Sequence, residues 1–289
     1  MNKIPAGKTI AYAYSFTFGH LGTIIGLVWL PLIVLTVLNF LPQIAGSDLD
    51  AAGQSPLVQG SQAIGRVTIS ALTLLLYAVI YVAVTRQALG LRQGTATVHF
   101  ALGMPEFRVF GAILLLLVVM MAFVGTYFGV VVLLASVGGN SVPMASIAGV
   151  VAVVGAAAIL YALVRLSFLI APVTVAEEKI SLARGWSLTQ GNFWRILGVM
   201  LSIGLPIFVV YVIGISALMG TELAAPVPAA IANNSQNLMQ HLKQIIDHHL
   251  PEIMGLELIL APFSIGLNLA AASFAYRALV QDSAVVRAA

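Results

Sequence analysis

The sequence contains no cysteine and few charged residues. The absence of cysteine from all 289 positions excludes disulfides, thiolate metal sites and cysteine nucleophiles. Charged residues make up 8% of the chain, against about a quarter of an ordinary soluble domain. So few charges could not cover the surface of a globular protein of this size. The composition therefore excludes a soluble enzyme, a nucleic-acid-binding protein and a disordered chain.

Apolar residues make up 60% of the sequence and form long runs without charge. A helix needs about 20 mostly apolar residues to cross a bilayer. Six runs satisfy this condition: 21–41, 67–85, 109–137, 145–164, 196–220 and 258–276. They predict an all-α membrane helix bundle that forms a single domain over residues 1–289. No short apolar core precedes Leu21, so we expect no removable signal peptide.

Lysine and arginine are distributed unevenly between the two ends of these runs. Ten of the 13 lie on the side that holds both termini, two lie on the other side, and Arg165 ends the fourth run. The positive-inside rule then places both termini in the cytoplasm, together with 87–108 and 177–195. Segments 45–62 and 222–257 are expected outside. We therefore expect a multi-pass protein of the cytoplasmic (inner) membrane.

Similar segments precede the first, third and fifth runs. Each has an aromatic anchor followed closely by glycine, and the anchors are Phe18, Phe107 and Phe193. A short amphipathic stretch lies before each anchor, at 9–15, 97–103 and 180–189. The pattern predicts three units, each with a surface helix and two spans. The alternative is that any entry into a membrane span tends to carry an aromatic residue and glycine.

Residues 165–198 carry a family resemblance, which rests on Arg165, Pro172, Glu177, Ala183, Trp186, Ser187, Leu188, Gly191 and Phe193. This stretch resembles the membrane-domain family found attached to glycerophosphoryl diester phosphodiesterases, and related six-span bacterial membrane proteins of unassigned role. The resemblance implies an integral membrane protein in a lipid-related setting. It implies no enzyme, since no soluble stretch here could form the catalytic barrel of those phosphodiesterases.

Three arginines end the even-numbered spans: Arg86, Arg165 and Arg277. If the repeat is real, they point toward a common axis and form a basic pocket for an anion or a lipid phosphate, with Arg165 deepest. Acids close to them in sequence are Glu106, Glu177 and Glu178. For Arg165 alone, the alternatives are a phosphate ligand, with Glu177 or Glu178 as partner, and an anchor that extends to the headgroups. We expect Pro172 to bend the chain and leave Arg165 at headgroup depth.

Two further segments are expected to lie on the membrane surfaces. Trp186 and Trp194 flank the short helix over 180–189, which we expect in the cytoplasmic headgroup layer, although a partner protein could bind it instead. Outside, an amphipathic helix is expected between the cap residues 233–235 and Pro251, which we expect to stop it.

The histidines of the expected outer helix are poorly spaced for a metal ion. His241 and His248 lie seven residues apart, which is roughly 10.5 Å along a helix and too far for one ion. His248 and Glu252 are closer, but Pro251 interrupts the helix between them. We therefore predict no metal, with a metal site or a pH-sensitive surface as the alternatives.

Two functions compete. The first is a non-catalytic membrane protein that binds lipid or a partner and has a role in the envelope. The second is a transporter or channel for a small solute or a lipid, favoured by the repeat and the three arginines, but spans one to three and five carry no charge deep in the membrane. We expect no cofactor. The expected partners are membrane lipids, and the alternative partners are a second copy of the chain or another protein.

Asn268 is the one strongly polar residue in the last span. We expect its side chain to form a hydrogen bond with a neighbouring helix.

Overall fold

The computed structural model describes residues 3–46, 56–91, 102–138, 142–223 and 235–288. Within these ranges the chain forms helices and no strand, which confirms the expected all-α fold. In chain order the helices are α1 (Ala6–Gly19), α2 (Leu21–Gly46), α3 (Pro56–Leu89), α4 (Met104–Gly138), α5 (Val142–Ser167), α6 (Ile170–Glu177), α7 (Leu182–Leu188), α8 (Phe193–Leu223), α10 (Ser235–His248) and α11 (Leu250–Ala288).

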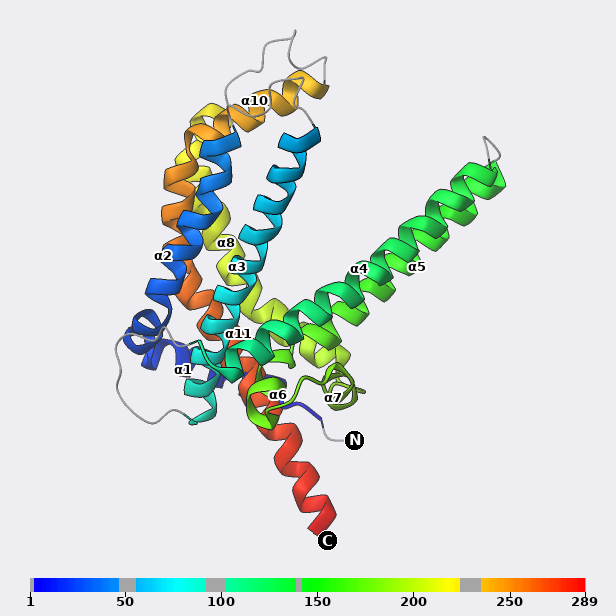
Figure 1. The fold of residues 1–289 in the computed structure, drawn as a ribbon. Coiled ribbons are helices and arrows are strands. Elements are labelled where there is room, and N and C mark those ends of the chain that lie inside the picture. The colour runs from blue at the N-terminus through cyan, green and yellow to red at the C-terminus, as the bar shows by residue number, and fades with distance from the viewer. Residues whose placement is uncertain (1–2, 47–55, 92–101, 139–141, 224–234, 289) are drawn as a thin grey trace.

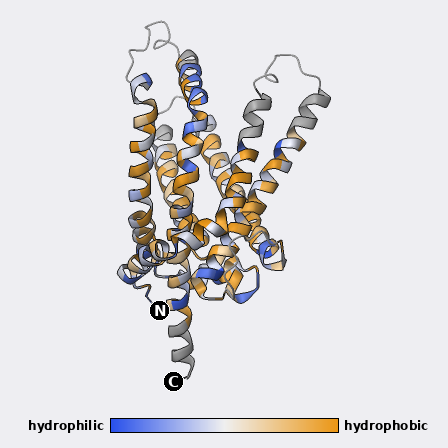
Figure 2. Cartoon of the chain, turned by 90° about the vertical axis from the view of Figure 1, so that its left-hand side faces the viewer, coloured by the Kyte–Doolittle hydropathy of each residue, from blue (hydrophilic) through white to orange (hydrophobic). Residues whose placement is uncertain are grey.

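Six stretches are long and apolar enough to cross a membrane, which confirms the expected number of spans. They are Leu21–Asn39, Ala63–Leu89, Met104–Leu134, Ser146–Glu177, Phe193–Glu222 and Leu250–Val280. Apolar residues cover most of their length, and hydrophilic residues gather toward their ends (Figure 2). The chain is therefore an integral, multi-pass membrane protein. Both chain ends lie at one end of the bundle, here called the terminal side, and α10 lies at the opposite end, the far side (Figure 1).

The last span begins earlier than the sequence predicts. α11 starts at Leu250 and not at Leu258, and Pro251 lies in its first turn. Proline is tolerated there because the first N–H groups of a helix have no acceptor within it. Pro251 therefore opens a helix where we expected it to end one. As a result Glu257, which we assigned to the outer loop, belongs to a membrane-spanning helix.

The fourth span contains a break between α5 and α6. Residues 168–169 form a turn, and Pro172 lies in the first turn of α6. The chain therefore bends before Pro172 and not at it. Arg165 lies in the last turn of α5 and is only 4% exposed, because α7 and Thr189 pack beside it.

Helices α4 and α5 form a hairpin that leans away from the rest of the bundle (Figure 1). Where side chains are described, the buried residues of α4 are Glu106, Val109 and Ala112, and those of α5 are Val164 and Arg165. All five lie on the terminal side, so the hairpin is held at that end. α4 has 35 residues. At 1.5 Å per residue this is roughly 52 Å, longer than the roughly 30 Å of hydrocarbon, so the helix must tilt.

The packed core lies on the terminal side around α11. α1, α6 and α8 meet it there, and buried residues of these helices, of the end of α5 and of the turn after α5 form one cluster that includes Ala13, Leu169, Ile196 and Ala271. A second cluster joins α2 and α3 to α11. α11 is thus the central helix of the bundle.

Short helices precede the first and fifth spans as expected. α1 covers the stretch 9–15, and α7 lies within 180–189. Most of 97–103 lies outside the described residues, and its last two residues are not helical. The expected outer helix is α10, which begins at Ser235. The threefold repeat stays a prediction.

Candidate functional site

A groove opens on the side of the bundle where α3, α8 and α11 meet. It contains a cavity of about 440 Å³. Its lining combines apolar surface with polar groups and includes Tyr77, Gly204, Phe208, Tyr211, Glu257 and Ser264. Gly204, Phe208 and Glu257 are exposed, so the cavity is open at the side of the bundle. Its volume falls within the roughly 300–1,000 Å³ of small-molecule sites.

A second cavity of about 210 Å³ adjoins the first, with Ser264 in the lining of both. Tyr81, Ser167 and Asn268 add polar groups to its walls. On α11, Glu257, Ser264 and Asn268 follow one another at intervals of seven and four residues. This spacing places them on one face of the helix. The two cavities therefore follow a single polar face of α11 from the far side toward the terminal side.

Glu257 and Asn268 are the most strongly polar side chains of the groove, and both are exposed. The Glu257 carboxylate interacts with the Tyr211 hydroxyl and lies near Tyr77. Asn268 Nδ2 donates a hydrogen bond to the Ser264 carbonyl at 2.8 Å. We expected this amide to bond a neighbouring helix, but its bond stays within α11. Among the described residues Asn268 Oδ1 accepts no hydrogen bond, so the amide can still bind another group.

The position of Asn268 along α11 places it well inside the membrane-spanning part. It lies 18 residues after Leu250 and nine residues before Arg277, which is roughly 27 Å and 14 Å along the helix. Polar side chains at such depth are costly in hydrocarbon and usually face a partner or a wet cavity. The groove thus suits a molecule with a largely apolar surface and a few polar groups.

Arg165 is the arginine that we expected to lie deepest in a basic pocket. Its side chain is bound by α5, by α7 and by Thr189, the residue that follows α7. It donates from Nε to the Thr189 hydroxyl at 3.3 Å, from Nη1 to the Tyr161 hydroxyl at 2.8 Å and from Nη2 to the Trp186 carbonyl at 2.6 Å. Its guanidinium carbon lies 3.8 Å from the centre of a Trp186 ring. These neutral groups hold the cation inside the protein, where it fixes α7 against α5.

Arg277 and Arg86 lie near the meeting point of α1, α3 and α11. Arg277 Nη2 donates to the Tyr12 hydroxyl at 2.7 Å, and that hydroxyl donates to the Ala88 carbonyl at 3.2 Å. Arg277 Nε is buried and has no hydrogen-bond partner within the described ranges of the chain. The side chain of the half-buried Arg86 makes no hydrogen bond or ion pair with the part of the chain that the structure describes. Arg165 has a separate set of partners, so a pocket shared by all three arginines stays a prediction.

The acids expected near Arg165 pair with other arginines. Glu177 accepts a hydrogen bond from Arg184 Nε at 2.9 Å and one from the Tyr276 hydroxyl at 3.3 Å, which joins α6, α7 and α11. Glu178 accepts one from Arg108 at 3.0 Å on the exposed surface. Neither acid is a partner of Arg165.

The two tryptophans that we expected to flank the short helix over 180–189 lie in different helices, Trp186 within α7 and Trp194 in the first turn of α8. Trp186 covers the Arg165 guanidinium and is 38% exposed, whereas Trp194 is 78% exposed. Trp186 therefore packs within the protein in addition to reaching its surface. The headgroup location of this helix stays a prediction.

The groove was missed in the sequence because Glu257 was assigned to the outer loop. Tyr77 and Tyr211 come from helices far apart in the sequence, so no local pattern joins them to α11. One signal was present, since Glu257, Ser264 and Asn268 recur at helical spacing within an apolar run. Potential metal ligands gather elsewhere, at the far side: Glu222, His248 and His249.

No family model, curated protein or solved structure matches this chain. The resemblance of residues 165–198 to the phosphodiesterase-associated membrane domains therefore stays a prediction.

Proposed function

We propose that this chain is a non-catalytic lipid-binding protein of the bacterial cytoplasmic membrane with a role in the envelope. One lipid would lie in the groove of α3, α8 and α11. The observation that supports the proposal is a groove with apolar walls in which Glu257 and Asn268 are exposed. A lipid offers both the apolar surface and the polar groups that such a groove needs.

The charge of the groove favours certain head groups. Glu257 is the only carboxylic acid among the residues that line the two cavities, no lysine, arginine or histidine lines either of them, and tyrosine hydroxyls adjoin Glu257. A carboxylate repels a purely anionic head group and binds donors such as ammonium or hydroxyl. Glu257 lies seven residues after Leu250, roughly 10 Å from the far end of α11. The lipid would therefore belong to the far leaflet, which is the outer one if both termini are cytoplasmic.

The test is to fill the groove without disturbing the fold. Gly204 lines the cavity on α8, and a Cβ added there would meet open space. Gly204→Leu should therefore place an isobutyl group where the lipid lies. Gly198→Leu is the matched control, since Gly198 is exposed on the same helix, has open space around its Cβ and lines neither cavity.

Native mass spectrometry of the detergent-purified chain would count the lipids retained by each protein. We expect about one retained lipid in the wild type and in Gly198→Leu, and a loss of at least half of that occupancy in Gly204→Leu. Equal retention in both variants, or no retained lipid in the wild type, would contradict the proposal.

Transport of a lipid or a small solute is a second candidate. It is favoured by the two adjoining cavities, which follow α11 from Glu257 to Ala272. Proteoliposomes loaded with a fluorescent lipid would test it. Transport predicts exchange between leaflets that depends on protein and is slowed by Gly204→Leu but not by Gly198→Leu; binding alone predicts no exchange.

A further inference from the structure

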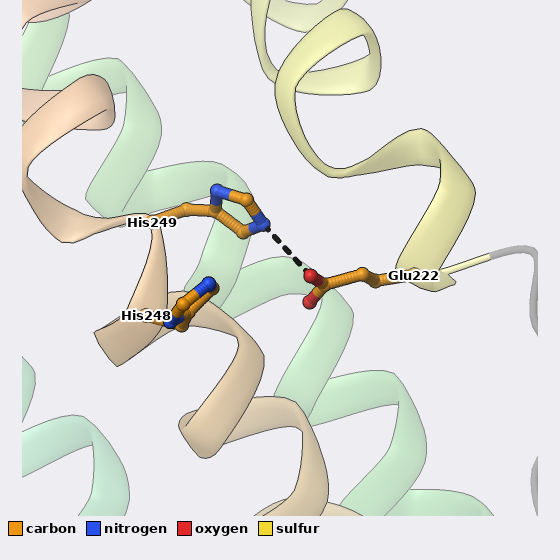
Figure 3. Close-up of side chains that lie close together, drawn as sticks. All are labelled: Glu222, His248 and His249. Atoms are coloured by element: carbon orange, nitrogen blue, oxygen red, sulfur yellow. Dashed lines mark ion pairs between the residues drawn. The ribbon is translucent and has the colours of Figure 1, made fainter.

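Three potential metal ligands converge on the far side, away from the groove. Glu222 lies near the end of α8, His248 is the last residue of α10, and His249 forms the link to α11. Figure 3 shows their side chains pointing toward one another from these two parts of the chain. One donor atom from each residue lies within 4.8 Å of the others.

The change of helix at this corner allows neighbouring histidines to converge. Side chains at consecutive positions of one helix point roughly 100° apart. Here α10 ends at His248 and α11 begins at Leu250, so His249 lies outside both helices. The two imidazole rings consequently lie close together, with their centres 5.0 Å apart. Both can therefore contribute to one site.

The contact between His249 and Glu222 has the spacing of two metal ligands. His249 Nε2 lies 3.2 Å from Glu222 Oε1, yet this buried nitrogen has no hydrogen-bond partner among the residues that the structure describes. The two atoms are thus close without the alignment of a hydrogen bond. Nitrogen and oxygen ligands bound about 2.0–2.2 Å from one tetrahedral zinc ion lie roughly 3.4 Å apart. A shared ion would explain both the short distance and the missing hydrogen bond.

We propose that Glu222, His248 and His249 bind one divalent transition-metal ion, with zinc as the best match. Two imidazoles and one carboxylate form a common zinc ligand set, and imidazole favours transition metals over magnesium or calcium. Both Glu222 and His248 are exposed, so their side chains can close the remaining distance by rotating without repacking a core.

The ion would connect two parts of the chain that are distant in sequence. It would tie the far end of α8 to the corner between α10 and α11. From the sequence we considered only His241 and Glu252 as metal-binding partners of His248, and we predicted no metal site. The proposed ligands instead come from the end of one helix and the link between two others, which sequence spacing does not show.

The experiment uses the full chain without an oligohistidine tag, purified in detergent, treated with a chelator and then titrated with ZnCl₂ alone. Calorimetry gives the affinity, and elemental analysis after desalting gives the bound zinc. We expect one zinc ion per chain in the wild type. His249→Ala and Glu222→Gln should weaken binding by more than about 100-fold, since loss of even an outer-shell partner costs about 10–100-fold.

The matched control is His241→Ala, which removes a histidine from the same outer helix but outside the cluster. It should bind zinc as the wild type does. Because Glu222→Gln keeps the size of the side chain, its loss of zinc cannot be ascribed to a missing side chain. Absence of stoichiometric zinc in the wild type, or equal affinity in His249→Ala and the wild type, would overturn the proposal.

Discussion

The helices around α11 and the α4–α5 hairpin are similarly apolar but differ in how much of each is buried. Buried residues make up 33% and 39% of the most apolar stretches of the α2 and α3 spans, and 50% of that of α11 itself, against 11% for the α4 span and 6% for the span of α5 and α6. α11 contacts α1, α2, α3, α6 and α8. Among the side chains that the structure describes, the hairpin is buried against the bundle on the terminal side alone, and large apolar side chains such as Val118, Phe128 and Val153 are exposed along it.

This difference shows that apolar composition does not determine what covers a membrane helix. Around α11, protein covers half of the α11 span and a smaller share of the spans beside it, and the exposed polar groups Glu257 and Asn268 identify a groove. Along the hairpin, the bilayer itself can cover the exposed apolar face, since lipid tails are as apolar as leucine. Exposed polar residues are therefore the better guide to a specific site in this protein.

The largest expected effect comes from Arg165, which holds the packed terminal side together. Arg165→Leu removes three hydrogen bonds and the contact with the Trp186 ring. We expect a loss of about 2–4 kcal/mol in unfolding free energy, because hydrogen bonds of charged groups and desolvated cation–π contacts contribute about 1.5–3 kcal/mol each before repacking. Denaturant titration of the detergent-purified protein would measure it.

Arg108→Leu is the comparison, since Arg108 forms an exposed ion pair with Glu178 on the same side. Exposed pairs contribute about 0.2–1 kcal/mol, so its effect should be clearly smaller. Equal losses in the two variants would show that burial of Arg165 adds nothing to stability.

A medium effect is expected within the hairpin, where α4 and α5 touch. The Tyr127 ring lies where a Cβ on Gly155 would be, and its hydroxyl donates to the Ala152 carbonyl at 2.8 Å. Gly155→Ala should therefore separate the two helices locally at a cost of about 1–3 kcal/mol. Hydrogen exchange should accelerate in α4 and α5 while α11 keeps its protection.

The control for this variant is Gly149→Ala, where the added Cβ meets open space on the same helix. It should leave exchange unchanged or slow it, because alanine favours the helix by up to about 1 kcal/mol. Faster exchange in α11 after Gly155→Ala would contradict a hairpin that packs independently of the central helix.

The smallest effect is expected at Glu178, which has a left-handed backbone with φ of 53°. Glu178→Gly removes strain of about 1–2 kcal/mol and also loses an exposed ion pair that contributes about 0.2–1 kcal/mol. Thermal unfolding should therefore match the wild type or show a slight gain. A clear loss would mean that the pair with Arg108 contributes more than exposed pairs usually do.

The number and places of the spans could be predicted because they depend on local composition. Each run needs only its own apolar residues to be identified, and the short helices α1, α7 and α10 also follow from short patterns. The predicted start of the last span was wrong because Pro251 can either end a helix or lie in the first turn of one, and only the neighbouring turns decide between the two.

The partners of the polar side chains could not be predicted, since they depend on how distant helices pack. Arg165 bonds neutral groups around α7, although nearby acids were the obvious candidates by charge. The groove required α3, α8 and α11 to meet, and the proposed metal ligands required the end of α8 to lie beside the α10–α11 corner. Sequence spacing contains no information on these approaches.

The most direct test of a specific groove is to find where a lipid binds. A photoactivatable phospholipid with an ammonium head group would be cross-linked to the reconstituted chain, and labelled peptides would be identified with and without excess unlabelled lipid. We expect saturable labelling of groove residues such as Phe208 and Leu260, and labelling of exposed hairpin residues such as Phe128 and Val153 that excess lipid does not selectively reduce. Labelling spread equally over groove and hairpin, with no saturable fraction, would contradict the account.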